Sequence, residues 1–269
     1  DEFFAGYLAL ADRYGTTLAG GDVSESKEKI VIDSIVVGEV SAGRAVLRST
    51  ARPNDQIFVT GTLGGAAAGL KLIELGARVS EPPAVAGGPR GSSPTVREGV
   101  SGNPTVREGA EDSDEDAIQT LLLRQLSPQP RVGWGIVLGE ERLATAMIDI
   151  SDGLSSDLAH LCNQSGVGAV IDAASLPLDD YVKQLCGRRA LDPLALALHG
   201  GEDFELLFTV APENAARLPK RVDGVLISRI GEVTDKAGAI RIHEKNREWE
   251  LQPEGFTHFG KSNHLVNNI

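Results

Sequence analysis

The 269-residue sequence is poor in cysteine, methionine and aromatic residues, the last making up only 4%. Its two cysteines, Cys162 and Cys186, have neither C-x-x-C spacing nor clustered histidines beside them, so we expect structural thiols in a reducing cytoplasm. No apolar run approaches the roughly 20 residues of a membrane-spanning helix, so we predict no membrane span. The chain opens at Asp1 and its only methionine is Met147, so we expect a fragment whose natural start lies upstream.

Basic residues are also scarce: 26 Lys and Arg stand against 38 Asp and Glu, a formal net charge of -12. This balance argues against nucleic acid as the main partner, because binding a phosphate backbone needs a basic face. Nucleotides remain possible ligands, because aspartates can hold metal ions that in turn bind the nucleotide phosphates. The length predicts one large or two ordinary domains, and 41% hydrophobic residues are enough for a core.

The segment that most suggests chemistry is Asp-Ile-Ser-Asp-Gly-Leu, residues 149–154. Residues 143–150 are apolar enough for a strand in the core of a sheet, and leucines at 154, 158 and 161 then recur at helical spacing. We expect Ser151 or Asp152 to be the helix N-cap. A helix N-terminus suits a phosphate, and aspartates beside it suit magnesium. The alternative is that these residues form only an N-cap.

Two further turns combine glycine with carboxylates at a strand end. Gly20-Gly21-Asp22 follows a predicted strand at 16–19, and Gly200-Gly201-Glu202-Asp203-Phe204-Glu205 leads into a predicted strand within 202–209. Glycine permits the close approach of a backbone to a ligand, so both turns are candidate binding elements. A plain turn explains each of them as well, and we interpret Asp203 and Glu205 as turn and strand-face carboxylates.

Helices and strands alternate along most of the chain, which predicts α/β layers and not an all-α bundle. The strand at 30–40, rich in β-branched residues, is the clearest, and we expect it to be buried on both faces. Further strands are predicted at 56–60, 168–171, 225–233 and 240–242. Helices are predicted at 3–14, 66–75, 117–126, 132–138, 178–186 and 193–198.

The glycine turn at 61–65 has neither a Walker A ending nor a G-x-G-x-x-G pattern, and a tight turn explains it as well as a phosphate loop does. After it, Pro-Thr-Val-Arg-Glu-Gly occurs at 94–99 and again at 104–109. The surrounding stretch has too little apolar surface to offset its ordering entropy, so we predict a flexible insertion without a catalytic role at about 76–112. We place a domain boundary between residues 43 and 44.

In this order, the three acidic glycine turns resemble the thiamine-monophosphate kinase family. The segments Arg-Ala-Val-Leu-Arg-Ser (44–49) and Val-Thr-Gly-Thr-Leu-Gly (59–64) carry the same likeness, which covers nearly the whole chain outside the insertion. That family belongs to the superfamily named for aminoimidazole ribonucleotide synthetase. The resemblance implies an α/β (α+β layered) fold in which 44–269 form the C-terminal domain and 1–43 are a remnant of the N-terminal one. In the family that domain carries a Gly-Asp-Asp motif and forms a homodimer, and nothing in this sequence matches the motif.

The resemblance implies ATP-dependent phosphorylation of thiamine monophosphate to thiamine diphosphate, with Mg²⁺, in the cytoplasm. It implies metal-binding roles for Asp22, Asp149 and Asp152, the last two also being catalytic. By the same resemblance, the nucleotide-contacting residues are Gly21, Arg48 and Ser151, with Phe4 beside the nucleotide in a looser match, and the thiamine-side residues are Glu202 and Phe256.

Two alternatives remain open on the sequence. One is another ATP-using enzyme of the same superfamily, such as an aminoimidazole ribonucleotide synthetase-like ligase or a selenophosphate synthetase-like enzyme. The other is a non-catalytic module that binds a nucleotide or a metal.

Overall fold

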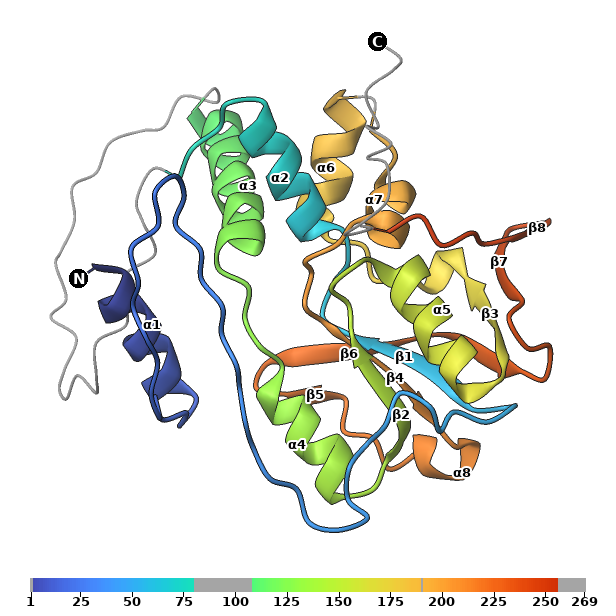
Figure 1. The fold of residues 1–269 in the computed structure, drawn as a ribbon. Helices are drawn as coiled ribbons and strands as arrows, with labels where there is room; N and C mark the ends of the chain where they lie inside the picture. Colours follow the sequence, from blue (N-terminus) through green and yellow to red (C-terminus); the bar gives the residue numbers. More distant parts are fainter. Residues whose placement is uncertain (1, 80–107, 190, 256–269) are drawn as a thin grey trace, which may run out of the picture.

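The computed structural model describes residues 2–79, 108–189 and 191–255 (Figure 1). Its helices are α1 (Glu2–Arg13), α2 (Gly65–Glu74), α3 (Glu108–Leu126), α4 (Val132–Glu140), α5 (Leu154–Ser165), α6 (Asp180–Arg189), α7 (Pro193–His199) and α8 (Pro212–Ala215), with a 3-10 turn at Ala173–Ser175. Its strands are β1 (Gln56–Thr60), β2 (Ala144–Asp149), β3 (Gly168–Asp172), β4 (Leu206–Val210), β5 (Arg221–Val222), β6 (Val225–Thr234), β7 (Ile240–Glu244) and β8 (Arg247–Glu250). In the described part of the chain, no helix combines the length and apolar character needed to cross a membrane.

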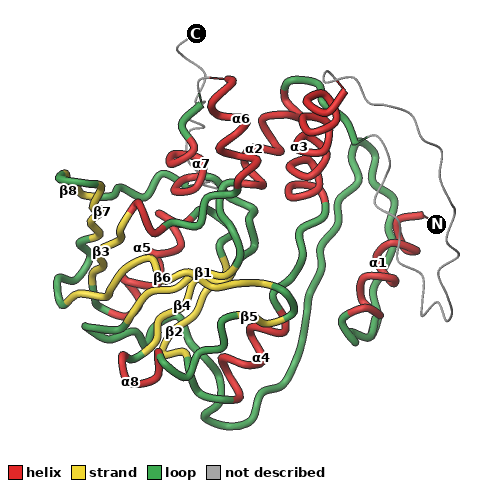
Figure 2. The backbone as a smooth tube through the Cα atoms, turned by 180° about the vertical axis from the view of Figure 1, so that it is seen from behind, coloured by secondary structure: helices red, strands yellow, loops and turns green. Residues whose placement is uncertain are grey.

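The strands form one mixed sheet in the order β2-β4-β1-β6-β3-β7-β8, with β5 paired to β6. Every pairing is antiparallel except that of β3 with β7. α4 and α5 pack against this sheet and further helices lie beyond it, so the predicted α/β class is confirmed (Figure 2). The predicted strand at 143–150 forms as β2, but it lies at the edge of the sheet and not in its middle.

Two cores lie on opposite faces of the sheet, because successive strand residues point to opposite sides. Ile57 and Val59 of β1 join the first core, to which α5 contributes Leu158. Phe58, between them in sequence, joins the second core together with Trp134 of α4. Burial on both faces is why β1 is a continuous apolar run and not an alternating one.

A third core holds α2, α3 and α6 together as a layer of helices. Ala68 and Leu72 of α2 pack with Leu121 of α3 and with Val182 and Cys186 of α6. Both cysteines are buried and unpaired, which agrees with the structural role expected for them. Gly69 permits the close contact of α2 with α3, since a Cβ atom there would collide with the Leu121 carbonyl oxygen.

The predicted strands at 16–19 and 30–40 were wrong. Neither segment has regular secondary structure, and no described residue before Ala51 is buried. Ile30 and Val37, expected inside a sheet, are 90% and 87% exposed. β-Branched residues favour a strand only where a neighbouring strand pairs with them and buries them, and no described strand lies beside this segment. Figure 1 shows α1 and this segment at one side of the molecule, away from the sheet.

Candidate active site

The acidic turn, which we define as residues 149–153, links the end of β2 to the start of α5. Asp149 is exposed at the strand end, while Ser151 and Asp152 are partly buried. Between them Ile150 is fully buried in the first core and anchors the turn. The turn therefore presents two carboxylates and a hydroxyl group at the surface from a fixed backbone.

The sheet brings the acidic turn against the glycine-carboxylate loop at 200–205. In the register of β2 with β4, Asp149 stands opposite Leu206, so the residues that follow one strand meet those that precede the other. Ile150 N–H donates to the Glu205 carbonyl oxygen at 2.8 Å, and Phe204 N–H donates to the Ile150 carbonyl oxygen at 2.9 Å. Glu202 N–H donates to the Ser151 carbonyl oxygen at 2.8 Å. Two of the three turns singled out in the sequence thus form one structure.

Glycine is required where these two segments cross. Gly153 has φ of 110°, and a Cβ atom on it would lie 3.0 Å from the His199 carbonyl carbon. A Cβ atom on Gly201 would lie 2.6 Å from the Ser151 carbonyl oxygen, closer than real Cβ contacts come. The loop also holds Glu202 and Phe204 at φ of 65° and 48°, a region that non-glycine residues seldom occupy. The backbone around the acidic turn is therefore tightly determined.

The predicted N-cap of α5 was wrong. The N-cap position is Gly153, and neither Ser151 nor Asp152 caps the helix with its side chain. Instead the Asp157 carboxylate accepts from the Asp152 N–H at 3.0 Å and from the Gly153 N–H at 3.1 Å. The oxygens of Ser151 and Asp152 are thereby left available for a ligand.

The negative charge of the acidic turn affects the pKa of Asp157. Burial raises the pKa of Asp157 to about 6, and the nearby charges of Asp152 and Asp149 add to this shift, while the hydrogen bond from Asp152 N–H opposes it. The sequence signal for Asp157 was an acidic residue in the first turn of a predicted helix, a position from which carboxylates reach back to free N–H groups.

Arg48 lies beside the acidic turn. It lines, together with Asp149, a cavity of about 530 Å³ whose other walls include Met147, Gln164 and Leu206. The segment that carries it runs along the outer edge of β2, where Met147 N–H donates to the Leu47 carbonyl oxygen at 3.2 Å. The structure thus places the predicted nucleotide-contacting arginine and a predicted metal-binding aspartate around one cavity.

Asp22 and Gly21 are not brought to the acidic turn. Both are exposed on the segment between α1 and β1, and the Asp22 carboxylate accepts a hydrogen bond from Ser24 at 3.2 Å. Phe4, on α1, contacts the ring of Phe3. Across the ranges that the structure describes, no three His, Cys, Asp or Glu side chains are grouped to hold a metal ion. The predicted three-aspartate metal site is therefore not assembled in this arrangement.

Asp149 and Asp152 by themselves fit magnesium. This ion prefers oxygen ligands, keeps several water molecules, and is bound in nucleotide sites by one or two carboxylates plus the substrate phosphates. The two aspartates supply such carboxylates at the surface, and the described chain places no histidine or cysteine with them in a metal-binding group.

Glu202, predicted on the thiamine side, is exposed next to the acidic turn. Its carboxylate accepts a hydrogen bond from Gln125 of α3, a residue that no pattern in the sequence singled out. Phe256 lies outside the described residues. Its neighbour Gly255 donates from its N–H to the Ser156 hydroxyl at 3.0 Å, and a Cβ atom on Gly255 would collide with the Asp152 carbonyl oxygen.

The glycine turn at 61–65 is a structural turn and not a phosphate loop. The Asp203 carboxyl group accepts from the Gly64 N–H at 2.7 Å and from the Ala66 N–H at 3.0 Å, so a side chain of the protein itself occupies the N-terminus of α2. Burial raises the pKa of Asp203 to about 7 against these two donors, which lower it. The interpretation of Asp203 as a turn carboxylate agrees with this geometry.

Comparison with known proteins identifies the class of protein to which this fold belongs. Residues 52–243 match the family of AIR synthase related proteins, C-terminal domain. The thiamine-monophosphate kinases of Salmonella typhimurium and Aquifex aeolicus are each 32% identical to the chain over 96% of its length and 68% of theirs. The chain therefore belongs to the thiamine-monophosphate kinase family.

Solved structures of that family have the same fold. The structure of thiamine-monophosphate kinase from Stenotrophomonas maltophilia K279a aligns with a TM-score of 0.57 at 32% identity, over 77% of this chain and 54% of that chain. The structure of AaThiL complexed with AMPPCP and TMP aligns with a TM-score of 0.57 at 29% identity, over 80% of this chain and 54% of that one. The chain thus matches about two thirds of the curated relatives' length and about half of each solved chain.

Proposed function

We propose that this chain takes part in the ATP-dependent transfer of a phosphoryl group to thiamine monophosphate, which yields thiamine diphosphate. The observation that carries the proposal is the packing of the acidic turn against the loop at 200–205. Membership of the thiamine-monophosphate kinase family supports it, as does a relative solved with AMPPCP, an ATP analogue, and with TMP. A cytoplasmic location and a homodimer are part of the same proposal.

Phosphoryl transfer depends on positioning of the reactants and neutralisation of their charge more than on a catalytic base. The acceptor is a phosphate monoester, and such an oxygen is already largely ionised near neutral pH. Donor and acceptor are both anions, so their repulsion is the main obstacle. Magnesium would offset this repulsion between the two phosphate groups.

Each site residue has a role in this proposal. Asp149 and Asp152 would hold the metal ion, and Ser151 would contact the nucleotide. The positively charged guanidinium of Arg48 would contact the nucleotide phosphates. Glu202 would contact the thiamine side. Asp22, Gly21 and Phe256 keep the roles given by the family resemblance: metal, nucleotide and substrate contacts respectively. We also propose that residues 1–43 and 44–269 belong to separate domains.

The test is an assay of ADP release coupled to detection of thiamine diphosphate, with the full 269-residue chain. Asp149→Asn and Asp152→Asn should each lower turnover by orders of magnitude, because each removes a metal-binding charge. Asp235→Asn, which changes an exposed carboxylate in the connection between β6 and β7, is the control and should leave turnover unchanged. Near-normal rates in both site variants would refute the proposal.

A second candidate is a non-catalytic module that binds a nucleotide with its metal ion. The position of Asp22, exposed and away from the acidic turn, favours it, because the described residues then do not assemble the full set of metal ligands. Calorimetric titration with Mg-ATP, followed by thiamine monophosphate, separates the two candidates. Binding of Mg-ATP without ADP release would support the module, whereas release that depends on thiamine monophosphate would exclude it.

A further inference from the structure

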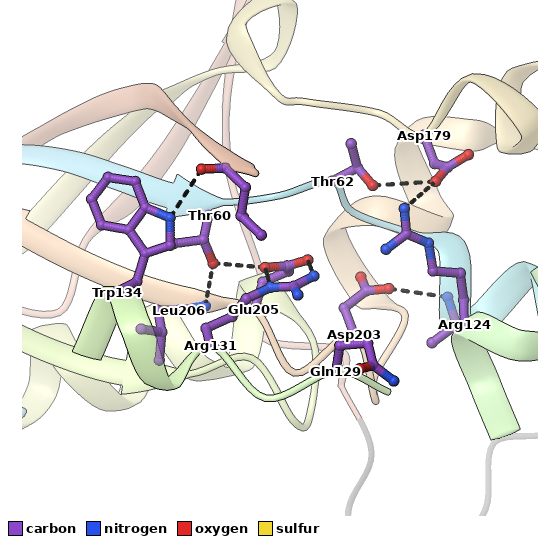
Figure 3. A network of polar contacts seen from close by, with 12 residues as sticks. Thr60, Thr62, Arg124, Gln129, Arg131, Trp134, Asp179, Asp203, Glu205 and Leu206 are labelled. Carbon is purple, nitrogen blue, oxygen red and sulfur yellow. Dashed lines mark hydrogen bonds and ion pairs between the residues drawn. The ribbon is translucent and has the colours of Figure 1, made fainter. Parts of the chain in front are cut away.

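A buried ion pair joins Arg131 to Glu205, the residue whose carbonyl oxygen accepts from the Ile150 N–H of the acidic turn. Glu205, 1% exposed, accepts from Arg131 Nε at 2.6 Å and from Arg131 Nη2 at 2.5 Å, a two-point contact between a guanidinium and a carboxylate (Figure 3). Thr60 at the end of β1 donates its hydroxyl to the same carboxylate at 2.7 Å. The side chain of Arg131 is 11% exposed, and the hydrogen bond to Glu205 raises its pKa further. Thr60 of β1 and Arg131 of the α3–α4 connection therefore meet at the carboxylate of Glu205, the residue before β4.

Glu205 and its neighbour Phe204 also bind the backbone of the acidic turn. The Glu205 carbonyl oxygen accepts from Ile150 N–H, and the neighbouring Phe204 N–H donates to the Ile150 carbonyl oxygen. Thr60 closes the network by accepting from Leu206 N–H at 2.8 Å. Ile150 is thus held through both of its backbone polar groups, and it stands between Asp149 and Ser151.

The carboxylate has little freedom to move. Gly61 has φ of 58°, and a Cβ atom on it would collide with the Glu205 carboxylate. A two-point contact fixes the plane of the guanidinium relative to the carboxylate, which a lysine ammonium could not do. The network is therefore a rigid support for a loop whose residues Glu202 and Phe204 sit at positive φ.

Stability alone does not account for such a pair. Removing two charges from water costs as much as their attraction returns, and apolar residues of similar volume often replace a buried ion pair without loss of stability. What apolar residues cannot reproduce is the directed, two-point orientation of the carboxylate.

We propose that Arg131 and Glu205 are positioning residues, which act through Ile150 to orient Asp149 and Asp152 for metal binding. This inference rests on the proposed function only in assigning metal binding to the oriented carboxylates. The orientation itself can be tested without measuring enzymatic turnover.

The decisive variant is Arg131→Met combined with Glu205→Leu, which replaces the pair by apolar side chains. Mn²⁺, bound by the same oxygen ligands as magnesium, is the probe, measured by its effect on the relaxation of water protons. The double variant should keep a melting temperature close to that of the unchanged chain but bind Mn²⁺ about tenfold more weakly, as when supporting residues of metal ligands are lost. Amide exchange should speed up in peptides covering 149–154 and 202–206 and stay unchanged in β3 and β7.

Arg131→Lys is the conservative variant, since it keeps the charge and loses the two-point contact, and it should weaken Mn²⁺ binding in the same direction. The matched control is the exposed pair of Arg229 and Glu232, changed to Lys and Gln, which should alter none of these measurements. Unchanged Mn²⁺ affinity and unchanged exchange in both turn peptides would overturn the proposal. Exchange that accelerates equally throughout the sheet would also overturn it, because the pair would then serve only stability.

These readouts separate this inference from the proposed function. If the unchanged chain releases no ADP, the kinase proposal fails, while Mn²⁺ affinity and amide exchange still report on the positioning of the turn. If the chain is active, the magnesium concentration for half-maximal rate should rise in the double variant by the same factor as the Mn²⁺ dissociation constant.

Discussion

The Asp203 carboxylate accepts a hydrogen bond from the Gly64 N–H at 2.7 Å and so fills the helix terminus that a phosphate would otherwise occupy. Helix N-termini attract anions because their first N–H groups are free and the helix dipole is positive there. In this chain that place is taken by a carboxyl group from the loop that also supports the acidic turn. The glycine turn at 61–65 thereby connects α2 to the candidate site instead of binding a nucleotide.

Replacing Asp203 by alanine should weaken this connection. The loss of a helix cap costs about 1 kcal/mol of unfolding free energy, and more where the cap also joins two segments. Asp192→Ala is the control, because Asp192 caps α7 through Leu194 N–H but joins only neighbouring residues. Urea unfolding should show a larger loss for Asp203→Ala than for Asp192→Ala. Equal losses would mean that Asp203 is only a local cap.

The raised pKa of Asp203 gives stability a particular pH dependence. With a pKa of about 7 in the folded chain and about 4 when unfolded, Asp203 takes up a proton on folding between these values. Its contribution to the free energy of unfolding is fully present below about pH 4 and is lost as the pH rises to about 7. Over this range the equilibrium constant for unfolding changes by at most about tenfold per pH unit.

The variant Asp203→Asn serves as the reference for that measurement, because the amide side chain cannot titrate. The free energy of unfolding of the unchanged chain, minus that of Asp203→Asn, should decline steadily between about pH 4 and about pH 7 and then level off. A difference that rises with pH, or that stays constant, contradicts the assignment of the raised pKa to Asp203.

Gly61→Ala should destabilise the chain far more than an ordinary glycine substitution at positive φ. The new methyl group would collide with the buried Glu205 carboxylate, which hydrogen bonds from Arg131 hold in place. Gly166→Ala is a matched control, because Gly166 has φ of 67° but nothing within 4 Å of its Cβ position. The control should lower the free energy of unfolding by about 1 kcal/mol, as expected for an α-L position. The melting temperature of Gly61→Ala should lie well below that of this control.

Gly255→Ala should disturb the end of the described chain where it meets the acidic turn. A methyl group there would collide with the Asp152 carbonyl oxygen and with the Ser156 hydroxyl. If Phe256 contacts the substrate as proposed, the KM for thiamine monophosphate should rise more than kcat falls. Gly187→Ala, with open space at its Cβ position, is the control. A fall in kcat alone would argue against a substrate role at this end.

The sequence predicted well those elements whose patterns are local. Helices at 3–14, 66–75 and 132–138 and the strand at 56–60 formed within a few residues of their predicted bounds. Hydrophobic periodicity identifies such elements because it records which face is buried. The strand predicted at 30–40 did not form, because strand formation is not decided locally. The side chains have strand character, but pairing requires a neighbouring strand that the sequence of this segment does not specify.

By itself, the sequence determined most of the helices and strands and the three turns in which glycine and carboxylate stand together. Only the tertiary structure decided which of these turns meet, because pairing of β2 with β4 places Asp149 opposite Leu206 and leaves Asp22 apart. It also decided which carboxylates face solvent: Asp149 does, whereas Asp203 binds the N-terminus of α2 and Glu205 binds Arg131. A carboxylate's role depends on the donors around it, and those donors come from parts of the chain far apart in sequence.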